Sequence, residues 1–500
     1  MLASIRSATL LGVDGHPVCV EVHVSNGLPG YTVVGLPDAA GRESRERVRA
    51  ALLSSGLGFP LKRITVNFAP ATLRKSGAGL ELAIALGIMC AESELPADEL
   101  DGVAVLGELG LDGSVRPVPG ALVLADALAR EGVEQVVVPE ANFHETALVR
   151  DLHVRSARNL AELRACLKGE EPWPDADVPS VATEPVATPA EPLDLADVRG
   201  LAVARHALEI AAAGTHHILL SGAPGSGKTM LAQRITTILP PLDDEEALDV
   251  TRIASTVAAE PPRALVRRRP FRAPHHTAST AALVGGGSAR PRPGEVTLAH
   301  RGTLFLDELG EFKASVLEAL RQPLEEHVVR IARQALSLEF PAQFLLVGCT
   351  NPCPCGLGQP ACRCSDAQRQ RYRKRLSAPL LDRFDLRLRV NGPSATDVSG
   401  ESSAVVVERV SEAVMRQRAR LHQTPWRRNG LVPAGALDEH AAVRGDALDA
   451  WRLVARERSL TGRGAARVRR VARTIADLEG EADISPEHIE DAAMLRADEP

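Results

Sequence analysis

The sequence predicts an α/β protein with a nucleotide-binding core, a helical domain after it and a separate α+β domain before it. Three observations lead to this prediction. A glycine-rich loop joins a strand candidate to a helix candidate at Gly222, a proline-rich stretch divides the chain, and strand candidates fade after about Pro393. We therefore expect domains at 1–168, 193–395 and 396–500, with a linker at 169–192.

The first domain alternates strands and helices. Its β-branched strand candidates are 19–24, 31–35, 63–67 and 135–138. Its helix candidates, recognised by apolar spacing, are 45–53, 80–90 and 120–130. The linker that follows holds six prolines among Ser, Thr, Asp and Glu, a composition typical of a flexible and partly extended connection.

The rest of the chain changes from mixed to helical. Its apolar strand candidates are 217–221, 303–306 and 344–348. Its later helix candidates are 405–421, 447–457, 464–478 and 486–496. The last of these has a clear start signal, with Ser485 as the N-cap residue and Pro486 in the first turn.

Composition and charge limit the location and the partners. The chain has 500 residues, of which 45% are apolar and only 3% aromatic, so its cores must consist mostly of aliphatic side chains. No apolar run approaches the roughly 18–20 residues that cross a bilayer, and the start lacks a signal-peptide core. We expect a cytoplasmic protein with no membrane partner. Basic clusters at 267–272 and 369–375, on a chain of net charge −6, fit either a phosphate-bearing partner or a solvated surface.

The glycine-rich loop matches a phosphate-binding pattern. It consists of Gly222, Ala223, Pro224, Gly225, Ser226, Gly227, Lys228 and Thr229, which fit G-x-x-x-x-G-K-[ST] between a strand and a helix. Such glycines let backbone N–H groups surround phosphates, and the helix N-terminus adds positive potential. We expect Lys228 to reach the β- and γ-phosphates of ATP and Thr229 to bind Mg²⁺.

Polar residues follow the next strand candidates. The strand 303–306 is followed by Asp307, a candidate Mg²⁺ ligand, and by Glu308, the candidate base that polarises the attacking water. The strand from 344 ends at Asn351, which either senses the γ-phosphate or is a turn residue before a proline. Arg383 is either a surface residue or a finger that completes the site of a neighbouring subunit.

Four of the eight cysteines are clustered. Cys353 and Cys355 are separated by six residues from Cys362 and Cys364. Two close thiol pairs in a turn-rich segment suit tetrahedral Zn²⁺, and a cytosolic chain makes disulfides the poorer explanation. The C-x-C spacing is less usual than C-x₂-C, so reduced surface thiols are the alternative.

Several longer motifs carry a family resemblance. They lie at 269–279 (RPFRAPHHTAS), 282–287, 291–300, 351–356 (NPCPCG) and 472–478. Together they resemble the magnesium-chelatase-like AAA+ proteins, and most closely the YifB/ComM group within them. The resemblance covers nearly the whole chain. Leu201 stands where the family often has Gln, and Arg301 stands where Asn is common; neither removes a catalytic group.

The resemblance implies a homohexameric AAA+ ring with ATP bound between subunits. Arg383 would act in trans, and Arg463 would act as sensor 2 from a helical lid, with Arg467 as the fallback for that role. It also implies a helix-2 insert inside 252–295 and a pre-sensor-1 hairpin at about 328–340.

In related helicases such hairpins line the pore, so Arg330 and Arg333 would contact DNA phosphates. The alternative is that these arginines pair with carboxylates such as Glu325 and Glu326.

The function implied by the resemblance is that of an ATP-hydrolysing motor on single-stranded or branched DNA. ComM members are regarded as motors that drive branch migration during natural transformation. Two other functions stay open: a chelatase-type ATPase that remodels a protein or metal-insertion complex, and an ATP-dependent assembly platform that does not translocate.

The N-terminal domain is similar to the Lon protease fold, whose enzymes use a Ser–Lys dyad. The serine would fall within Gly77-Ala78-Gly79 and the lysine near Leu122, so both groups are missing. Ser76 and Lys75 are adjacent in sequence and do not replace them. We therefore expect a scaffold for assembly or binding rather than a protease.

Overall fold

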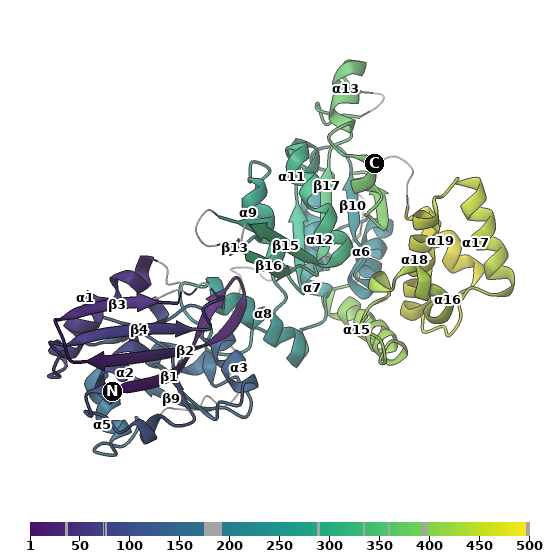
Figure 1. Ribbon diagram of the computed structural model, residues 1–500. Coiled ribbons are helices and arrows are strands. Elements are labelled where there is room, and N and C mark those ends of the chain that lie inside the picture. The colour runs from purple at the N-terminus through teal and green to yellow at the C-terminus, as the bar shows by residue number, and fades with distance from the viewer. Residues whose placement is uncertain are drawn as a thin grey trace. The chain divides into compact units, whose positions relative to one another are not determined.

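The computed structural model describes residues 1–35, 39–73, 75, 78–174, 193–287, 291–333, 336–358, 361–392 and 398–496 (Figure 1). Contacts between residues divide the chain into two compact units. The first contains the N-terminal part of the chain together with Asp243–Arg267, and the second contains the remainder of the described residues. Most of the predicted linker lies outside the described residues.

The first unit is built on a seven-stranded sheet in the order β3-β4-β2-β1-β5-β8-β9. These strands are β1 (Leu2–Leu11), β2 (Asp14–Ser25), β3 (Gly30–Val34), β4 (Arg63–Ala69), β5 (Val103–Val105), β8 (Gln135–Pro139) and β9 (His153–Ala157). Its longer helices are α1 (Ala39–Ser54), α2 (Glu81–Ala91), α3 (Ala121–Arg130) and α5 (Leu160–Leu167). The four predicted strands and three predicted helices are confirmed as elements, with ends that shift by a few residues.

Strand β1 is one that the sequence analysis missed. The face of β1 toward the core carries Ala3 and Ile5, but also Ser7 and Thr9. Because two of these four buried residues are polar, the strand lacks a regular alternation of buried apolar and exposed polar residues. The Ser7 hydroxyl donates to the Val105 carbonyl oxygen at 2.7 Å, which satisfies this buried polar group.

Helix α8 (Asp244–Val257) belongs to the first unit although the chain supplies it after α7 (Lys228–Ile238). Arg252 on α8 pairs with Asp126 on α3 at 2.8 Å, and the Gly120 N–H donates to the Ser255 carbonyl oxygen at 2.8 Å. The expected insert at 252–295 overlaps this segment only in part, because the residues that pack with the first unit already begin at Asp243.

The second unit contains a parallel five-stranded sheet in the order β11-β14-β17-β10-β18. The strands are β10 (Ile218–Ser221), β11 (Phe271–Arg272), β14 (Thr303–Leu306), β17 (Leu345–Thr350) and β18 (Leu386–Arg389). The helices before the lid are α6 (Ala202–Gly214), α7, α9 (Thr280–Val284), α10 (Glu295–Leu298), α11 (Ala314–Ala319), α12 (Arg321–Glu326), α13 (Asp366–Arg373) and α14 (Ala378–Leu381). The three predicted strands are confirmed as β10, β14 and β17.

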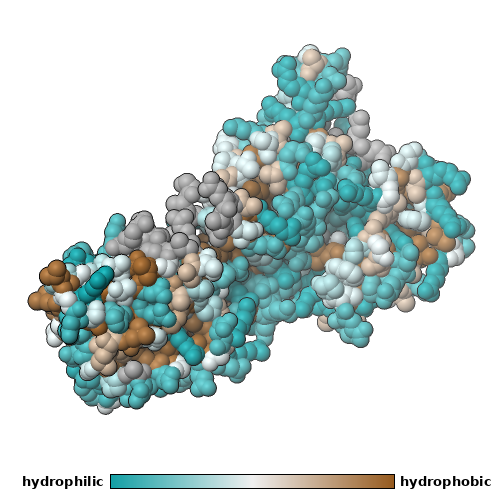
Figure 2. All heavy atoms as spheres, viewed as in Figure 1, coloured by the Kyte–Doolittle hydropathy of each residue, from teal (hydrophilic) through white to brown (hydrophobic). Residues whose placement is uncertain are grey.

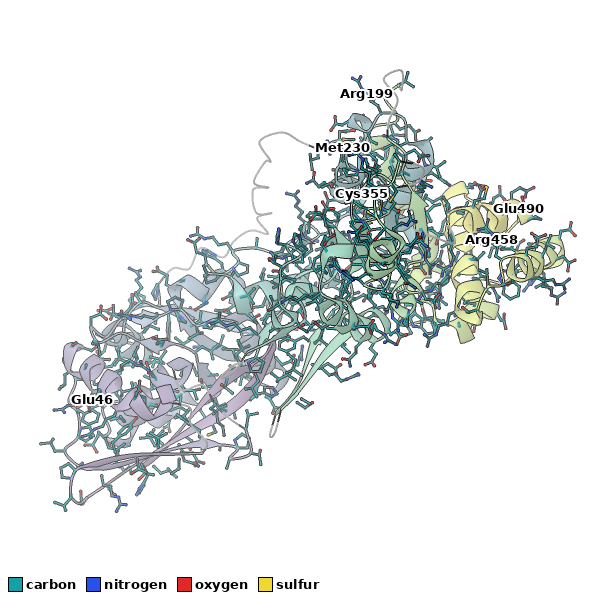
Figure 3. All side chains as sticks on the ribbon, turned by 90° about the horizontal axis from the view of Figure 1, so that it is seen from above. Glu46, Arg199, Met230, Cys355, Arg458 and Glu490 are labelled. Atoms are coloured by element: carbon teal, nitrogen blue, oxygen red, sulfur yellow. The ribbon has the colours of Figure 1, made fainter. Side chains whose placement is uncertain are left out.

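The helical region after β18 is confirmed as well. Its main helices are α15 (Ser403–Arg420), α17 (Gly445–Glu457), α18 (Gly462–Glu479) and α19 (Pro486–Met494). Figure 3 labels Arg458 and Glu490 of this region at one end of the second unit. These helices after β18 are called the lid below. Lid helices α15, α18 and α19 share one apolar core with β10, β17, α6 and α7, so the lid packs directly on the sheet domain.

A hairpin precedes β17, as predicted. It is formed by β15 (Val328–Arg333) and β16 (Leu336–Pro341), which pair antiparallel in the register Val328↔Pro341 to Arg333↔Leu336.

The two positions that depart from the family pattern share one backbone feature. Leu201 and Arg301 both have left-handed backbone, with φ of 52° and 59°. Asn tolerates this conformation better than most residues, so the backbone at position 301 suits the Asn that the resemblance implies there. Arg301 is nevertheless held there, because its Nη1 donates to Gln343 Oε1 at 2.7 Å.

A buried ion pair joins the sheet to the lid. Asp385, directly before β18, accepts a hydrogen bond from Arg467 Nη1 of α18 at 2.6 Å, and His216 Nδ1 lies 3.5 Å from its Oδ2. Burial alone would raise the pKa of the Asp385 carboxyl, but Arg467 and His216 hold that pKa well below its usual range. Arg467, the fallback for the sensor 2 role, is therefore engaged in a structural pair.

Replacing Asp385 by Asn should destabilise the second unit by about 3–5 kcal/mol, because Arg467 would stay buried without its carboxylate. Denaturant unfolding measures this loss. Since the folded-state pKa of Asp385 is depressed, its contribution should be fully present above about pH 4, the ordinary carboxyl pKa, and should decline as the pH falls further.

Asp449→Asn is the matched control. Asp449 pairs with Arg452 at 3.5 Å on the surface, so its loss should cost less than about 1 kcal/mol. Equal losses of stability in the two variants would contradict the structural role given to Asp385.

Candidate nucleotide-binding site

The phosphate-binding loop turns between β10 and α7. Gly225 and Gly227 have φ of 77° and 90°, and a Cβ on Gly222 would lie 2.3 Å from the Val390 carbonyl oxygen, so glycine is required at all three positions. Lys228 Nζ donates to the carbonyl oxygens of Gly222 and Ala223, each at 2.8 Å. Burial lowers the pKa of Lys228. The loop has the backbone that phosphate binding needs, with an ammonium group directed into it.

Two side-chain oxygen donors meet beside this loop. The Thr229 hydroxyl donates to Asp307 Oδ2 at 2.9 Å, and the Glu308 N–H donates to Asp307 Oδ1 at 2.9 Å. A hydroxyl and a carboxylate are the donors that hold Mg²⁺ in P-loop enzymes. The donor set therefore fits Mg²⁺, and Thr229 and Asp307 are the two residues expected from the sequence to bind it.

Asn351 completes the group from the next strand. It follows β17, and its Oδ1 lies 3.4 Å from Lys228 Nζ. A side chain that already contacts the phosphate-binding lysine is suited to sense the γ-phosphate.

Glu308 has a partner that the sequence analysis did not assign. Its backbone is left-handed, with φ of 50°, and its Oε2 lies 3.1 Å from His276 Nδ1. The His276 ring is held by His275, at a centroid distance of 4.1 Å, and by the edge of Phe312. The signal for this residue was available: the two histidines closely follow β11, and β11 pairs in parallel with β14, the strand that ends two residues before Glu308.

Arg383 and Arg463 meet at a shared carboxylate. Arg383 is only 5% exposed and pairs with Glu325 of α12, and Arg463, 69% exposed at the start of α18, has its Nη1 3.5 Å from Glu325 Oε1. Within the described part of the chain, no hydrogen bond or ion pair joins either arginine to Lys228, Thr229 or Asp307. Arg383 and Glu325 line a hollow of about 530 Å³.

Of the two hairpin arginines, Arg330 and Arg333, the structure describes the side chain of Arg330. Arg330 pairs with Glu326 and with Glu339, the latter at 3.1 Å, and is half exposed. Glu326 is one of the carboxylates expected under the alternative to DNA contact. The side chain of Arg333 lies outside the described residues.

The four clustered cysteines converge. All four Sγ atoms lie within 4.8 Å of one another, with Cys353–Cys355 at 3.3 Å, Cys353–Cys362 at 3.5 Å and Cys355–Cys362 at 3.9 Å. A tetrahedral Zn²⁺ with Zn–S bonds of about 2.3 Å requires sulfur atoms roughly 3.8 Å apart. Backbone N–H groups of Arg363 and Leu357 lower the pKa of Cys355 to about 6, which favours the thiolate. The donor set therefore fits Zn²⁺.

The cysteine segment also touches the phosphate-binding loop. Gly356 has φ of 79°, and a Cβ there would lie 2.6 Å from Pro224 Cγ. Figure 3 labels Cys355 in the same unit as Met230 of α7. The cysteines thus hold a turn that packs against the nucleotide site.

In the first unit, the amine of Lys75, next to the expected serine position in the sequence, donates to backbone carbonyl groups. Lys75 is buried, and its Nζ donates to the carbonyl oxygens of Phe68 at 2.9 Å, Gly35 at 3.1 Å and Pro70. Burial lowers its pKa. Leu122, near the expected lysine position, is fully buried, and Ser76 lies outside the described residues.

Comparison with known families gives three consecutive matches. The family described as "Magnesium chelatase, subunit ChlI" matches residues 194–398. "Subunit ChlI of Mg-chelatase" matches 20–142, and "Magnesium chelatase, subunit ChlI C-terminal" matches 400–496. No helix in the described ranges is long and apolar enough to cross a membrane.

Two similar proteins match over almost their full length. The chain is 41% identical to the uncharacterized protein YifB of Escherichia coli and 40% identical to the competence protein ComM of Haemophilus influenzae, in both cases over 99% of this chain and 97% of the relative. It is 25% identical to the magnesium-chelatase 38 kDa subunit of Chlorobaculum parvum, over 41% of this chain and 54% of that subunit.

Lys228→Ala should abolish ATP binding, and Glu308→Gln should keep binding while lowering turnover by about 10²–10⁴-fold. The first change removes the ammonium group at the phosphates, and the second removes only the base. Binding of a fluorescent ATP analogue and steady-state phosphate release measure the two effects.

Glu311→Gln serves as the control, because Glu311 lies three residues away and pairs with Arg375 on the surface. It should hydrolyse ATP normally. Wild-type turnover by Glu308→Gln would show that another group is the base.

Proposed function

The chain belongs to the YifB/ComM family of magnesium-chelatase-like AAA+ ATPases, and on that basis we propose that it is a ring-shaped motor that acts on DNA. The observation that carries the ATPase part is the Thr229–Asp307 contact at 2.9 Å beside Lys228. ATP and Mg²⁺ would bind there. Glu308 would polarise the attacking water, and Asn351 would respond to the γ-phosphate.

Ring assembly is proposed from the position of the two arginines. Arg383 and Arg463 share Glu325 and make no described contact with the phosphate-binding loop of their own chain. We propose that Arg383 completes the site of a neighbouring subunit in a homohexamer and that Arg463 acts as sensor 2. Mixing Arg383→Ala with Glu308→Gln subunits should restore part of the activity, and no recovery at any ratio would count against action in trans.

Zinc is proposed as a structural component of the cysteine cluster. The sulfur distances fit a tetrahedral ion, and the segment packs on Pro224 of the phosphate-binding loop. Bound zinc would hold Cys353, Cys355, Cys362 and Cys364 together and stiffen the turn after Asn351. Elemental analysis of protein purified without chelator should find about one zinc per chain, and its absence would reject the proposal.

The proposal also includes contact between the hairpin arginines, Arg330 and Arg333, and DNA phosphates. For Arg330 to meet a phosphate, it would have to leave Glu326 and Glu339. Replacing Arg330 and Arg333 by Ala tests this contact. Unchanged DNA affinity and salt dependence would remove the hairpin from the DNA path.

For the first unit we propose a Lon-like scaffold without peptidase activity, joined by a linker to the ATPase domain and lid. The engagement of the Lys75 amine with backbone carbonyls supports this. Cleavage of casein by the purified protein would overturn it.

A chelatase-type role ranks second. The magnesium-chelatase subunits match only 33–41% of this chain, at 25–26% identity, whereas ComM matches 99% of it. An assembly platform ranks third, because the Thr229–Asp307 contact beside Lys228 supports a hydrolysing site.

The DNA part of the proposal predicts that single-stranded or branched DNA raises steady-state ATP hydrolysis. Binding of the partner would stabilise the ring and order the residues that meet between subunits. Phosphate release is measured with and without DNA, with Lys228→Ala as the control for contaminating ATPases. A rate that DNA does not change at any concentration would favour the chelatase-type or platform alternatives.

A further inference from the structure

Helix α13 and the residues before it form a compact basic segment. Residues 361–375 contain six Arg or Lys residues and one Asp, on a chain whose net charge is −6. Figure 1 shows α13 projecting away from the sheet of the second unit. The corresponding end of the molecule is largely hydrophilic in Figure 2. This projection therefore carries a dense cluster of positive charge.

Two of these basic residues are used to build the segment. Arg369 pairs with Asp366 one helical turn away. Arg375 Nη1 donates to the Gly310 carbonyl oxygen and to Glu311 Oε2, both at 2.8 Å. These residues attach and stabilise the helix.

Three others face outward. Arg363, Arg371 and Lys374 are exposed, and among the residues that the structure describes their side chains have no ion pair or hydrogen bond. A charged side chain in this state loses little when it binds an anion, because no internal partner has to be displaced. Arg330 differs in this respect, because it would have to leave two carboxylates before it could bind an anion.

Tyr372 anchors α13 next to the residues of the candidate nucleotide site. Its ring is buried, and a Cβ on Gly310 would lie 2.3 Å from its Cζ, so only glycine fits under it. The Tyr372 hydroxyl lies 3.3 Å from Thr350 Oγ1, one residue before Asn351. The outward face is thus carried by a helix that packs on the turn after Glu308 and on the end of β17.

We propose that Arg363, which lies shortly before α13, Arg371 on α13 and Lys374 at its C-terminal end together bind the phosphate backbone of a DNA strand. The inference rests on the proposed DNA function and names the contact surface for it. Because the one aromatic side chain of this segment, Tyr372, is turned inward, the surface offers charge and no base stacking. Binding is therefore independent of sequence and strongly dependent on salt.

The test is the affinity of the full-length protein for a fluorescent oligo(dT) strand and a mixed-sequence strand over a range of salt concentrations. Arg371→Ala/Lys374→Ala should weaken both complexes equally. It should also flatten the plot of log affinity against log salt by about 0.7 for each phosphate that the variant no longer neutralises. Arg452→Ala/Arg456→Ala removes the same charge from α17 and should leave affinity and slope unchanged.

The charge-conserving swap Arg371→Lys/Lys374→Arg separates charge from folding. It should keep wild-type affinity and slope. Loss of binding in the swap would mean that the first variant failed through structure, which would overturn the assignment of a charge contact.

The other outcomes distinguish failure of the α13 contact surface from failure of the proposed DNA function. If wild-type protein binds DNA and Arg371→Ala/Lys374→Ala binds with the same affinity and slope, α13 is not the contact surface. If wild-type protein binds no DNA strand at any salt concentration, the proposed DNA function itself fails. If polyglutamate displaces the strand as effectively as unlabelled DNA of equal charge, the surface fits an acidic polypeptide and the assignment to DNA is overturned.

Discussion

The parallel pairing of β10, β14 and β17 is the constraint on which the candidate site depends. In the register Ser221↔Thr350 and Leu306↔Gly348, the carboxyl ends of three buried strands lie next to one another. The phosphate-binding loop, Asp307 and Asn351 each begin where one of these strands stops. Three segments separated by up to 130 residues in the chain therefore meet at one edge of the sheet. A change of register would separate Thr229 from Asp307 even if every motif stayed intact.

The same sheet also ties the lid to the arginine region. Asp385 lies between Arg383 and the start of β18, and it is held by Arg467 of α18. Arg467 Nη1 also donates to the Arg383 carbonyl oxygen at 3.0 Å. A displacement of α18 would thus act on the backbone that carries Arg383. This connection gives a physical route by which the lid and the proposed finger move together.

Local motifs made part of this structure predictable. Lys228, Thr229, Asp307 and Asn351 each directly follow a strand or a loop with a recognisable pattern, so their meeting at one site could be predicted without the fold. The four cysteines were predictable for the same reason, since their spacing in the sequence is short. The continuous apolar runs of β10, β14 and β17 identified these strands as buried.

Contacts between distant segments were not predictable in this way. The approach of His276 to Glu308 depends on β11 pairing with β14, and the sharing of Glu325 by two arginines depends on how α12 meets the lid. Strand β1 was missed because Ser7 and Thr9 occupy its buried face. Helix α8 belongs to the first unit because it packs against α3. No pattern within residues 244–257 indicates this contact by itself.

The central claim is that ATP hydrolysis at this sheet edge drives movement along DNA. It is tested most directly by following the branch point of a labelled four-way DNA junction, with the full-length protein and either ATP or a non-hydrolysable analogue. The account predicts that the wild-type protein moves the branch point only with ATP and that Glu308→Gln does not move it. ATP hydrolysis by the wild-type protein on a bound junction whose branch point stays in place would contradict it.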